Sequence, residues 1–201
     1  MQGLTGDHRA AIASHEQALA MFQSLGSLFD QADALCQLGF NECAMGNYAA
    51  AAARHRQSLD LFLRLGDRLG QAWATGGLGE VQCATGDYAA ASANFTKALQ
   101  VHRELGQRRS EAVMLNMLGD LSLAISAAED AYRSYSQALA IAREIGAQNE
   151  QAWALAGMGT VLLPSNRAEA AAHLREALEV YQRIGSREAQ RIQDMLTEHG
   201  L

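Results

Sequence analysis

The residue types that most often carry out chemistry are scarce in this chain, and their spacing matches no familiar reactive arrangement. Three cysteines occur, Cys36, Cys43 and Cys83, and they form neither a CxxC redox pair nor the ligand pattern of a zinc ribbon. On one helix, Cys36 and Cys43 would lie about 10 Å apart along the axis, which is too far for a disulfide bond. We therefore expect reduced thiols that pack as small side chains.

Enzymatic motifs are also missing from the sequence. It contains no Walker loop, no HExxH, no GxSxG and no strand-turn-helix pattern in which a dinucleotide fingerprint would work. We therefore predict that the protein is not an enzyme, and that it uses no cofactor and no metal.

Charge and composition narrow the class of protein further. The formal net charge of -6 gives no electrostatic reason to bind nucleic acid or an anionic membrane surface. The first twenty residues do not resemble a signal peptide, and no apolar run is long enough to span a bilayer. With 49% hydrophobic residues, 18 Gly and only 1 Pro, the sequence favours a cytoplasmic, all-α protein.

A repeat of about forty residues runs along the whole chain. Leucine or isoleucine followed by glycine ends successive segments at Gly26, Gly66, Gly106, Gly146 and Gly185. A second glycine column, after leucine or methionine, consists of Gly39, Gly79, Gly119 and Gly159. Between the columns, apolar residues recur with helical spacing, so each repeat is predicted to hold two amphipathic helices, helix A and then helix B.

Local signals predict where these helices begin and end. In the first complete repeat, helix A is expected over Leu28–Met45 and helix B over Tyr48–Leu65. Asn47 and Asp87 stand where helix B needs an N-cap, and the glycine after leucine or isoleucine stands where a left-handed residue ends it.

Helix B carries the columns that predict close packing. Alanine recurs at its second turn and is followed four residues later by a larger side chain, as His55, Phe95, Tyr135 and Leu174 show. Small residues allow two helices to approach closely, while the larger side chain fills the space between them. His15 and His55 share the large-residue column, so we interpret them as partly buried packing residues and not as metal ligands.

These features together resemble the tetratricopeptide repeat (TPR): Leu-Gly in helix A, Gly-x-Tyr between the helices, then Ala-x-x-x-aromatic and Ala-Leu in helix B. The forty-residue unit is longer than the usual unit of about 34. It resembles the extended variety of Leu-Gly-Asn polarity adaptors and of the helical arrays in bacterial regulators. Helix A departs from the consensus by lacking its Trp, and two turns depart at Ser126-Ala127-Ala128 and Pro164-Ser165-Asn166.

The resemblance implies an α-solenoid of antiparallel helix pairs, a right-handed TPR superhelix of about ten helices. We expect one domain over residues 1–201, made of a lone helix B at 7–25, complete repeats at 27–65, 67–105, 107–145 and 147–184, and a capping helix at 186–199. The lone helix B would leave an apolar face around Ile12 and Leu19 uncovered. We therefore expect either a fragment of a longer protein or pairing with a second copy there.

In such a solenoid, helix A would line a concave wall, and ligands would bind on that wall. The candidate residues share a helix A face and vary between repeats: Asp33, Gln37, Phe40, Trp73, Glu80, Asn116, Met117, Asp120, Trp153 and Thr160. Two interpretations stay open for the aromatic residues, which are either packing residues or apolar anchors of a peptide groove. In the second, the acidic residues favour a basic partner and Asn116 offers its amide to a peptide backbone.

The predicted function is a protein- or peptide-binding scaffold or adaptor whose partner presents an apolar or basic segment. The candidate columns hold no Lys or Arg, which disfavours a clamp for a terminal carboxylate, and they lack the paired Asn of the polarity adaptors. A self-assembly module that dimerises through its N-terminal helix, or the sensor part of a larger signalling regulator, remains the alternative. A peptide-pheromone receptor would be a special case of peptide binding.

Overall fold

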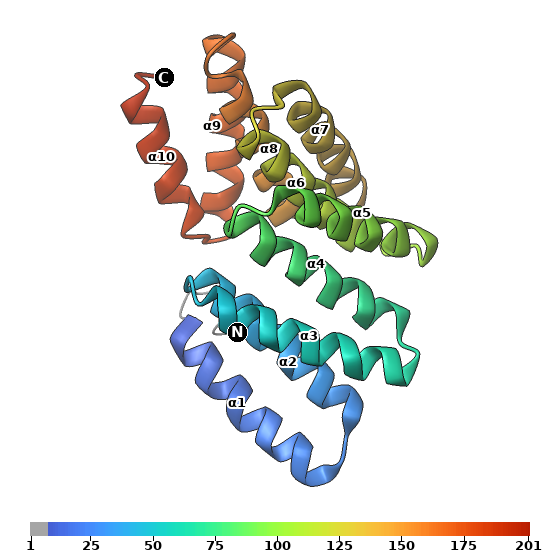
Figure 1. Cartoon of the computed structure of the whole chain (residues 1–201). Helices are drawn as coiled ribbons and strands as arrows, with labels where there is room; N and C mark the ends of the chain where they lie inside the picture. Colours follow the sequence, from blue (N-terminus) through green and yellow to red (C-terminus); the bar gives the residue numbers. More distant parts are fainter. Residues whose placement is uncertain (1–7) are drawn as a thin grey trace. The chain divides into compact units, whose positions relative to one another are not determined.

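The computed structural model describes residues 8–201, and within that range every regular element is an α-helix (Figure 1). The predicted lone helix began at Asp7, which lies outside the described residues. The predicted all-α class with about ten helices is confirmed. The helices are α1 (His8–Leu25), α2 (Leu28–Ala44), α3 (Tyr48–Leu65), α4 (Arg68–Ala84), α5 (Tyr88–Glu104), α6 (Arg108–Ala124), α7 (Ala128–Ile145), α8 (Gln148–Leu162), α9 (Arg167–Arg183) and α10 (Glu188–Glu198).

Helix ends follow the glycine columns of the sequence. Gly66 and Gly146 adopt left-handed conformations with φ of 69° and end α3 and α7, as predicted. The turns from helix A to helix B use Gly46 and Gly86 in the same way, and in the third repeat Ser126 takes this role with φ of 62°. A side chain in that conformation is strained, so the third turn departs from the others in its backbone energy as well as in its sequence.

N-caps were predicted with partial success. The Asp87 carboxylate accepts a hydrogen bond from the Ala90 N–H at 3.2 Å, which satisfies one of the free donors at the start of α5. The Asn47 side chain makes no such bond at the start of α3 and instead donates to Glu42 Oε2 at 2.6 Å. Asn47 therefore occupies the N-cap position of α3 as predicted, but its side chain makes no capping bond, because a carboxylate on the preceding helix binds its amide.

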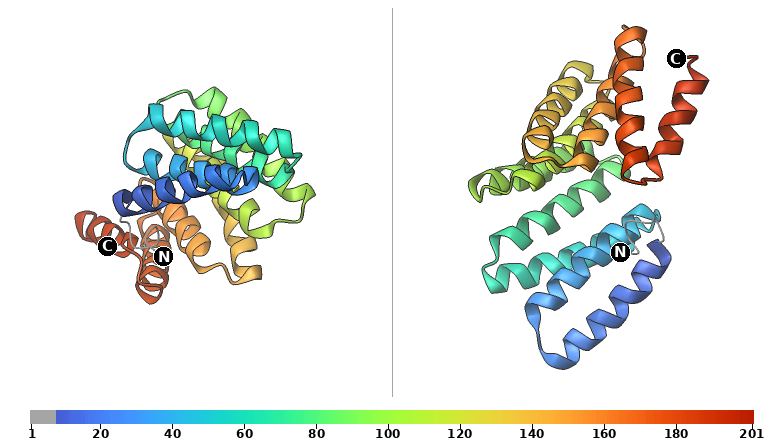
Figure 2. Two further views of the ribbon diagram at one scale, coloured as in Figure 1. Left: turned by 90° about the horizontal axis from the view of Figure 1, so that it is seen from below. Right: turned by 180° about the vertical axis from the view of Figure 1, so that it is seen from behind.

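The helices form two compact units that divide between Leu105 and Gly106. In the first unit α2 packs against α3 and α4, and in the second α6 packs against α7 and α8. At the C-terminal end α10 packs against α9, and both views of Figure 2 show these last two helices, orange and red, as neighbours. That the residues 1–201 form a single domain stays a prediction.

The N-terminal helix does not present the apolar face that its sequence suggested. Leu19 is buried against Leu35 and Leu38 of α2, and Ile12 packs on the same cluster. The face of α1 that points away from α2 is mostly polar, with Met21 and Leu25 as its large exposed apolar residues. Ile12 and Leu19 therefore contribute to packing within the first unit, so the face around them is not uncovered as predicted. Dimerisation through this helix stays a prediction.

Close approach of helix A to helix B depends on glycines opposite a large side chain. Tyr135 of α7 is fully buried and lies over Gly119 of α6 and Gly157 of α8. A Cβ atom added at Gly157 would lie 2.4 Å from the Tyr135 ring, and one added at Gly119 would lie 2.5 Å from it. His55 of α3 occupies the corresponding place in the first unit, over Gly39 and Gly77. Each large side chain thus holds together its own helix A and the next one.

This packing predicts that Gly157→Ala is destabilising. The added methyl group overlaps a buried ring whose hydroxyl is bonded to Asp120, and overpacking of this kind costs about 1–3 kcal/mol in the free energy of unfolding. Urea unfolding followed by circular dichroism measures the change. In a Tyr135→Leu background, which copies Leu174 of the next repeat, the same glycine substitution should cost clearly less. An equal cost in both backgrounds would show that the ring does not cause the strain.

Candidate functional site

In the first unit, the predicted site residues lie on α2 and α4, the helix A elements of two successive repeats. Asp33 and Gln37 of α2 are exposed to solvent, while Phe40 is half-buried. Trp73 and Glu80 of α4 are also half-buried. We call the surface formed by these five residues the first acceptor surface. It combines exposed polar atoms with two aromatic side chains that are neither fully buried nor fully exposed.

The aromatic residues of this surface pack on two histidines from helix B elements. The Phe40 ring meets the Trp73 ring edge to face, with centroids 6.4 Å apart, and meets the His55 ring at 4.8 Å. Trp73 also contacts His102 of α5, with the two ring centroids 5.1 Å apart. Such arrangements favour fixed ring orientations. Both interpretations of the aromatic residues therefore apply in part, since Phe40 and Trp73 pack within the unit and also keep solvent-accessible surface.

His55 is an unusual packing residue because its polar atoms have no partners. The residue has 0% exposure, and neither Nδ1 nor Nε2 makes a hydrogen bond. Burial lowers its pKa to about 4, since a charged imidazolium in this apolar place would lose its hydration. Burial also lowers the pKa of His102, whose ring nitrogens are likewise without partners. These histidines are neutral near pH 7, and the sequence prediction that His55 is a packing residue is confirmed.

The second unit places different chemistry at the corresponding positions, eighty residues further along the chain. Asp120 replaces Phe40, Tyr135 replaces His55, and a tryptophan, Trp153, again stands where Trp73 does. The Tyr135 hydroxyl donates to Asp120 Oδ1 at 2.6 Å, and Trp153 Nε1–H donates to Asp120 Oδ2 at 3.1 Å. The Phe40 ring, which packs on Trp73 and His55 in the first unit, is thus replaced by a carboxylate that accepts hydrogen bonds from both neighbouring rings.

The Asp120 carboxylate is held in a fixed position and keeps acceptor capacity. The residue retains solvent-exposed atoms. Desolvation by the surrounding protein raises its pKa, while hydrogen bonds from Tyr135 and Trp153 and the charge of Arg191 oppose that shift. Arg191 belongs to α10 and pairs with Glu188 at 2.7 Å. A carboxylate has about four acceptor positions, so Asp120 can accept a further donor from a ligand.

Desolvation also raises the pKa of Tyr135 far above its usual range, and the neighbouring Asp120 charge adds to the effect. Its hydroxyl therefore remains a proton donor at any ordinary pH. Helix-based reasoning assigned Tyr135 to packing alone and missed this second role. The sequence does contain a signal for this role, because two positions change together between the first and third repeats. Phe40 becomes Asp120, and His55 becomes Tyr135.

Asn116 does not belong to the accessible surface, contrary to the prediction. It has 0% exposure, and its Nδ2 donates to the backbone oxygen of Glu150 at 3.1 Å. Glu150 is itself buried and forms an ion pair with Arg109 at 2.8 Å. The amide that was expected to bind a peptide backbone instead joins α6 to α8. Spacing along one helix did not show that the neighbouring helix A would cover this position.

The remaining candidates of the second unit differ in exposure. Met117 of α6 and Thr160 of α8 are half-buried. The Thr160 hydroxyl donates to the Ala156 backbone oxygen at 2.8 Å and lies 3.8 Å from Met195 Sδ of α10. We call Met117, Asp120, Trp153 and Thr160 the second acceptor surface. Among the described residues, the structure thus brings nine of the ten predicted site residues to partly or fully accessible positions and buries Asn116.

The cysteines have the properties of packing residues. Cys36 and Cys43 are buried, and burial raises the pKa of each thiol to about 12. The thiolate is the reactive form of cysteine, so these two side chains are poor nucleophiles at neutral pH. In the described part of the chain, no group of three or more His, Cys, Asp and Glu side chains is placed to hold a metal ion. None of the described helices has both the length and the apolar character needed to cross a bilayer.

Comparisons with known proteins support the repeat architecture. Residues 30–104 match the family model for the tetratricopeptide repeat, which covers the first two complete helix pairs. No curated protein matches the chain in sequence. The extended forty-residue variety and the likeness to Leu-Gly-Asn adaptors stay predictions.

Solved structures extend this similarity to nearly the whole chain. BtubC (BKLC) from P. vanneervenii aligns with 98% of this chain and 77% of its own, at 19% identity and a TM-score of 0.65. A putative kinesin light chain from Podosopora anserina, described as having nearly identical TPR-like repeats, aligns with 91% of both chains at 13% identity and a TM-score of 0.61. These similarities establish the α-solenoid fold that the repeat predicted.

The burial of His55 predicts a loss of stability in mild acid. Its folded pKa of about 4 lies below the unfolded value of 6.5, so the unfolded chain binds the proton more readily. The free energy of unfolding is therefore not reduced by His55 above pH 6.5. As the pH falls from 6.5 towards 4, it decreases by about 3 kcal/mol in total, because the unfolded chain takes up the proton first. His55→Phe, which copies Phe95, should remove this part of the pH dependence.

Urea unfolding at pH 7.5, 6.0 and 5.0 measures this effect, and the relevant quantity is the difference between the wild type and His55→Phe. The difference cancels the titration of carboxylates that both proteins share. It should grow steadily as the pH falls. A difference that stays constant over this range would mean that His55 is protonated in the folded protein or that the ring becomes hydrated.

Proposed function

We propose that the protein is a scaffold that binds segments of a partner protein on its two acceptor surfaces, one in each unit. The TPR match over residues 30–104 supports this in general, since repeats of this class commonly serve as protein-interaction scaffolds. The observation that carries the proposal for this chain is the carboxylate of Asp120, held by Tyr135 and Trp153 and still open to solvent. A fixed acceptor beside an aromatic ring suits a basic side chain.

The two acceptor surfaces select different parts of a partner. Around Phe40 and Trp73 the first acceptor surface is largely aromatic, with Asp33 and Gln37 exposed nearby. Around Asp120 and Trp153 the second acceptor surface is charged. A partner with an apolar anchor for the first and a lysine or arginine for the second satisfies both. This is the apolar or basic segment that the sequence predicted.

The proposal includes an adaptor role in the cytoplasm without catalysis. Neither acceptor surface includes a serine or cysteine next to a histidine, the pairing that activates many covalent nucleophiles. Dimerisation through α1 is not favoured, because Ile12 and Leu19 pack within the first unit.

Affinity capture from a lysate of the source organism tests the proposal. Wild type is compared with a variant that combines Asp33→Arg and Asp120→Asn, and with the control Glu179→Arg, which changes an exposed carboxylate on α9 outside both surfaces. We expect one or more proteins that the wild type and the control retain equally and that the double variant retains at least about tenfold less, since each lost charge-assisted contact costs about 1–3 kcal/mol. Equal capture by all three proteins, or no capture by wild type, would refute it.

The two tryptophans allow the captured partner to be localised, because the chain has only 2 Trp and each acceptor surface contains one. In Trp73→Phe the emission comes from Trp153 alone, and in Trp153→Phe it comes from Trp73 alone. Addition of the purified partner should change both signals at the same concentration if one partner spans both surfaces. A partner that changes neither signal binds elsewhere, and the acceptor surfaces would then not be its site.

A further inference from the structure

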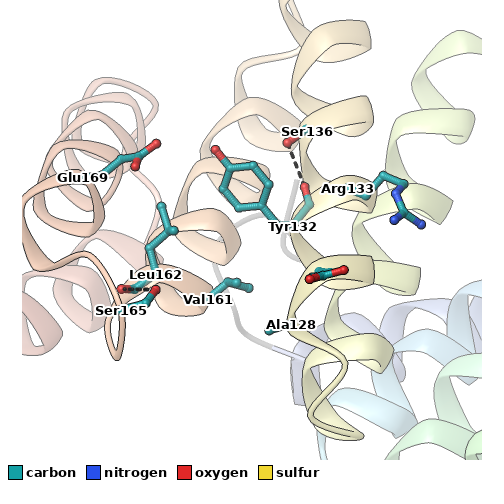
Figure 3. Close-up of a pocket in the computed structure, with 9 residues that line it drawn as sticks. Ala128, Tyr132, Arg133, Ser136, Val161, Leu162, Ser165 and Glu169 are labelled. Atoms are coloured by element: carbon teal, nitrogen blue, oxygen red, sulfur yellow. Dashed lines mark hydrogen bonds between the residues drawn. The ribbon is translucent and has the colours of Figure 1, made fainter.

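A cleft of about 660 Å³ opens in the second unit between α7, the end of α8 and the start of α9 (Figure 3). Its volume falls within the range of known ligand pockets, about 300–1,000 Å³. Val161 and Leu162 of α8 form its apolar part, and Tyr132 of α7 extends beside them. No residue of the two acceptor surfaces lines this cleft.

The cleft lies where the third repeat departs from the others. Ala128 occupies the position of the consensus tyrosine, which is present in the first two repeats as Tyr48 and Tyr88. Four residues later a small residue is replaced by a large one, Tyr132. The other repeats carry Ala52, Ser92 and Ala171 at this position. The exchange removes a large side chain at the start of α7 and adds one a full turn further on. The space beside Ala128 and the ring of Tyr132 both follow from it.

A strained residue precedes this exchange. Ser126 adopts φ of 62°, whereas the equivalent turns of the first two repeats use Gly46 and Gly86. Left-handed backbone at a residue with a side chain costs on the order of 1 kcal/mol, and such strain is found preferentially at functional positions. The third turn therefore differs from its copies in side chains and in backbone energy at the same place.

The charges around the cleft favour a cation. Glu129 of α7 and Glu169 of α9 both line it. The cation among the lining residues, Arg133, is paired with Asp130 at 2.8 Å, and Figure 3 shows its side chain extending away from Leu162 and Glu169. Tyr132 lies on the side towards Glu169, whose charge adds to the desolvation that raises the phenol pKa. An aromatic ring in a cleft that carboxylates also line is a favourable environment for a lysine or arginine side chain.

We propose that this cleft is a second docking site, which takes a peptide segment of a partner protein with a lysine or arginine next to a leucine-sized residue. The apolar side chain packs on Val161 and Leu162. The basic side chain crosses the Tyr132 ring and reaches Glu129 or Glu169. Docking here is independent of the acceptor surfaces, because the residues involved do not overlap. The chain can then hold two segments of one partner, or segments of two partners.

Methyl NMR with labelled methionine tests this site in the full chain. Met158 Sδ lies 4.0 Å from the hydroxyl of Ser136, which lines the cleft, whereas Met117 belongs to the second acceptor surface. The probe is a synthetic peptide of about ten residues in which leucine and lysine alternate. We expect the Met158 signal to shift progressively as the peptide is added. Peptides that alternate leucine with glutamate, or glycine with lysine, should bind at least about tenfold more weakly, since each lacks one of the two contacts.

Variants of the cleft make the assignment specific. Tyr132→Ala restores the residue found at this position in the first and fourth repeats, so the fold should tolerate it, and we expect Kd for the leucine–lysine peptide to rise about tenfold. Glu129→Lys should weaken binding similarly. The matched control Glu179→Lys reverses an exposed charge on α9 away from the cleft and should leave Kd unchanged, as should Asp120→Asn on the second acceptor surface.

Several results would overturn the proposal. A Met158 signal that does not move with any of the three peptides excludes peptide docking in the cleft. Equal binding of the leucine–glutamate peptide contradicts the charge argument. An unchanged Kd in both Tyr132→Ala and Glu129→Lys places the peptide elsewhere, and a shift of Met117 in place of Met158 identifies the acceptor surface. A wild-type mass in solution twice that of Tyr132→Ala would show that a second copy of the chain occupies the cleft.

Discussion

One contact recurs in both units and fixes the positions of the other elements: a large side chain of helix B lies over glycines of two successive helix A elements. His55 lies over Gly39 and Gly77, and Tyr135 lies over Gly119 and Gly157. A helix that carries glycine in its interior gives up about 1 kcal/mol of helix propensity relative to alanine. Burial of a full ring against two helices offsets that cost. The same contact sets the distance between the helix A elements and so the spacing of the side chains on their accessible face.

The inserted side chain is buried beneath the accessible residues and contacts them, so its chemistry decides which residues can stand above it. A neutral imidazole at His55 offers only a ring surface, and Phe40 and Trp73 pack around it. A phenol at Tyr135 carries a donor at its far end, and a carboxylate at Asp120 accepts it. The fold accommodates either residue because the space over the two glycines fits an imidazole ring or a phenol ring. A repeat protein can thus change its binding surface through a residue that sequence comparison classifies as core.

The sequence predicted the parts of the fold that depend on local physics. Helix ends followed from glycines such as Gly66 and Gly146, which adopt the left-handed conformation that other residues avoid, and the boundaries of α3 came out as expected. Prediction was wrong where a second element decides the outcome. The Asn47 amide bonds to Glu42 and not to the start of α3, Asn116 is covered by α8, and Ile12 packs towards α2. Spacing along one helix gives a face, but it does not show what lies opposite that face.

Variation between repeats is therefore an ambiguous sign of function, and three positions show how to separate its meanings. Asn116 varies within the protein interior and bonds to a neighbouring backbone, so its variation is structural. Asp120 varies together with Tyr135, and the two side chains form a hydrogen bond. This variation therefore changes both the internal packing and the charge on the accessible face. Tyr132 varies at a half-buried position where the other repeats carry alanine or serine, and its hydroxyl interacts with Glu169, so this variation places an aromatic ring at the wall of the cleft. Such a change leaves a cleft lined by an aromatic ring and carboxylates, which is a surface suited to contact with another molecule.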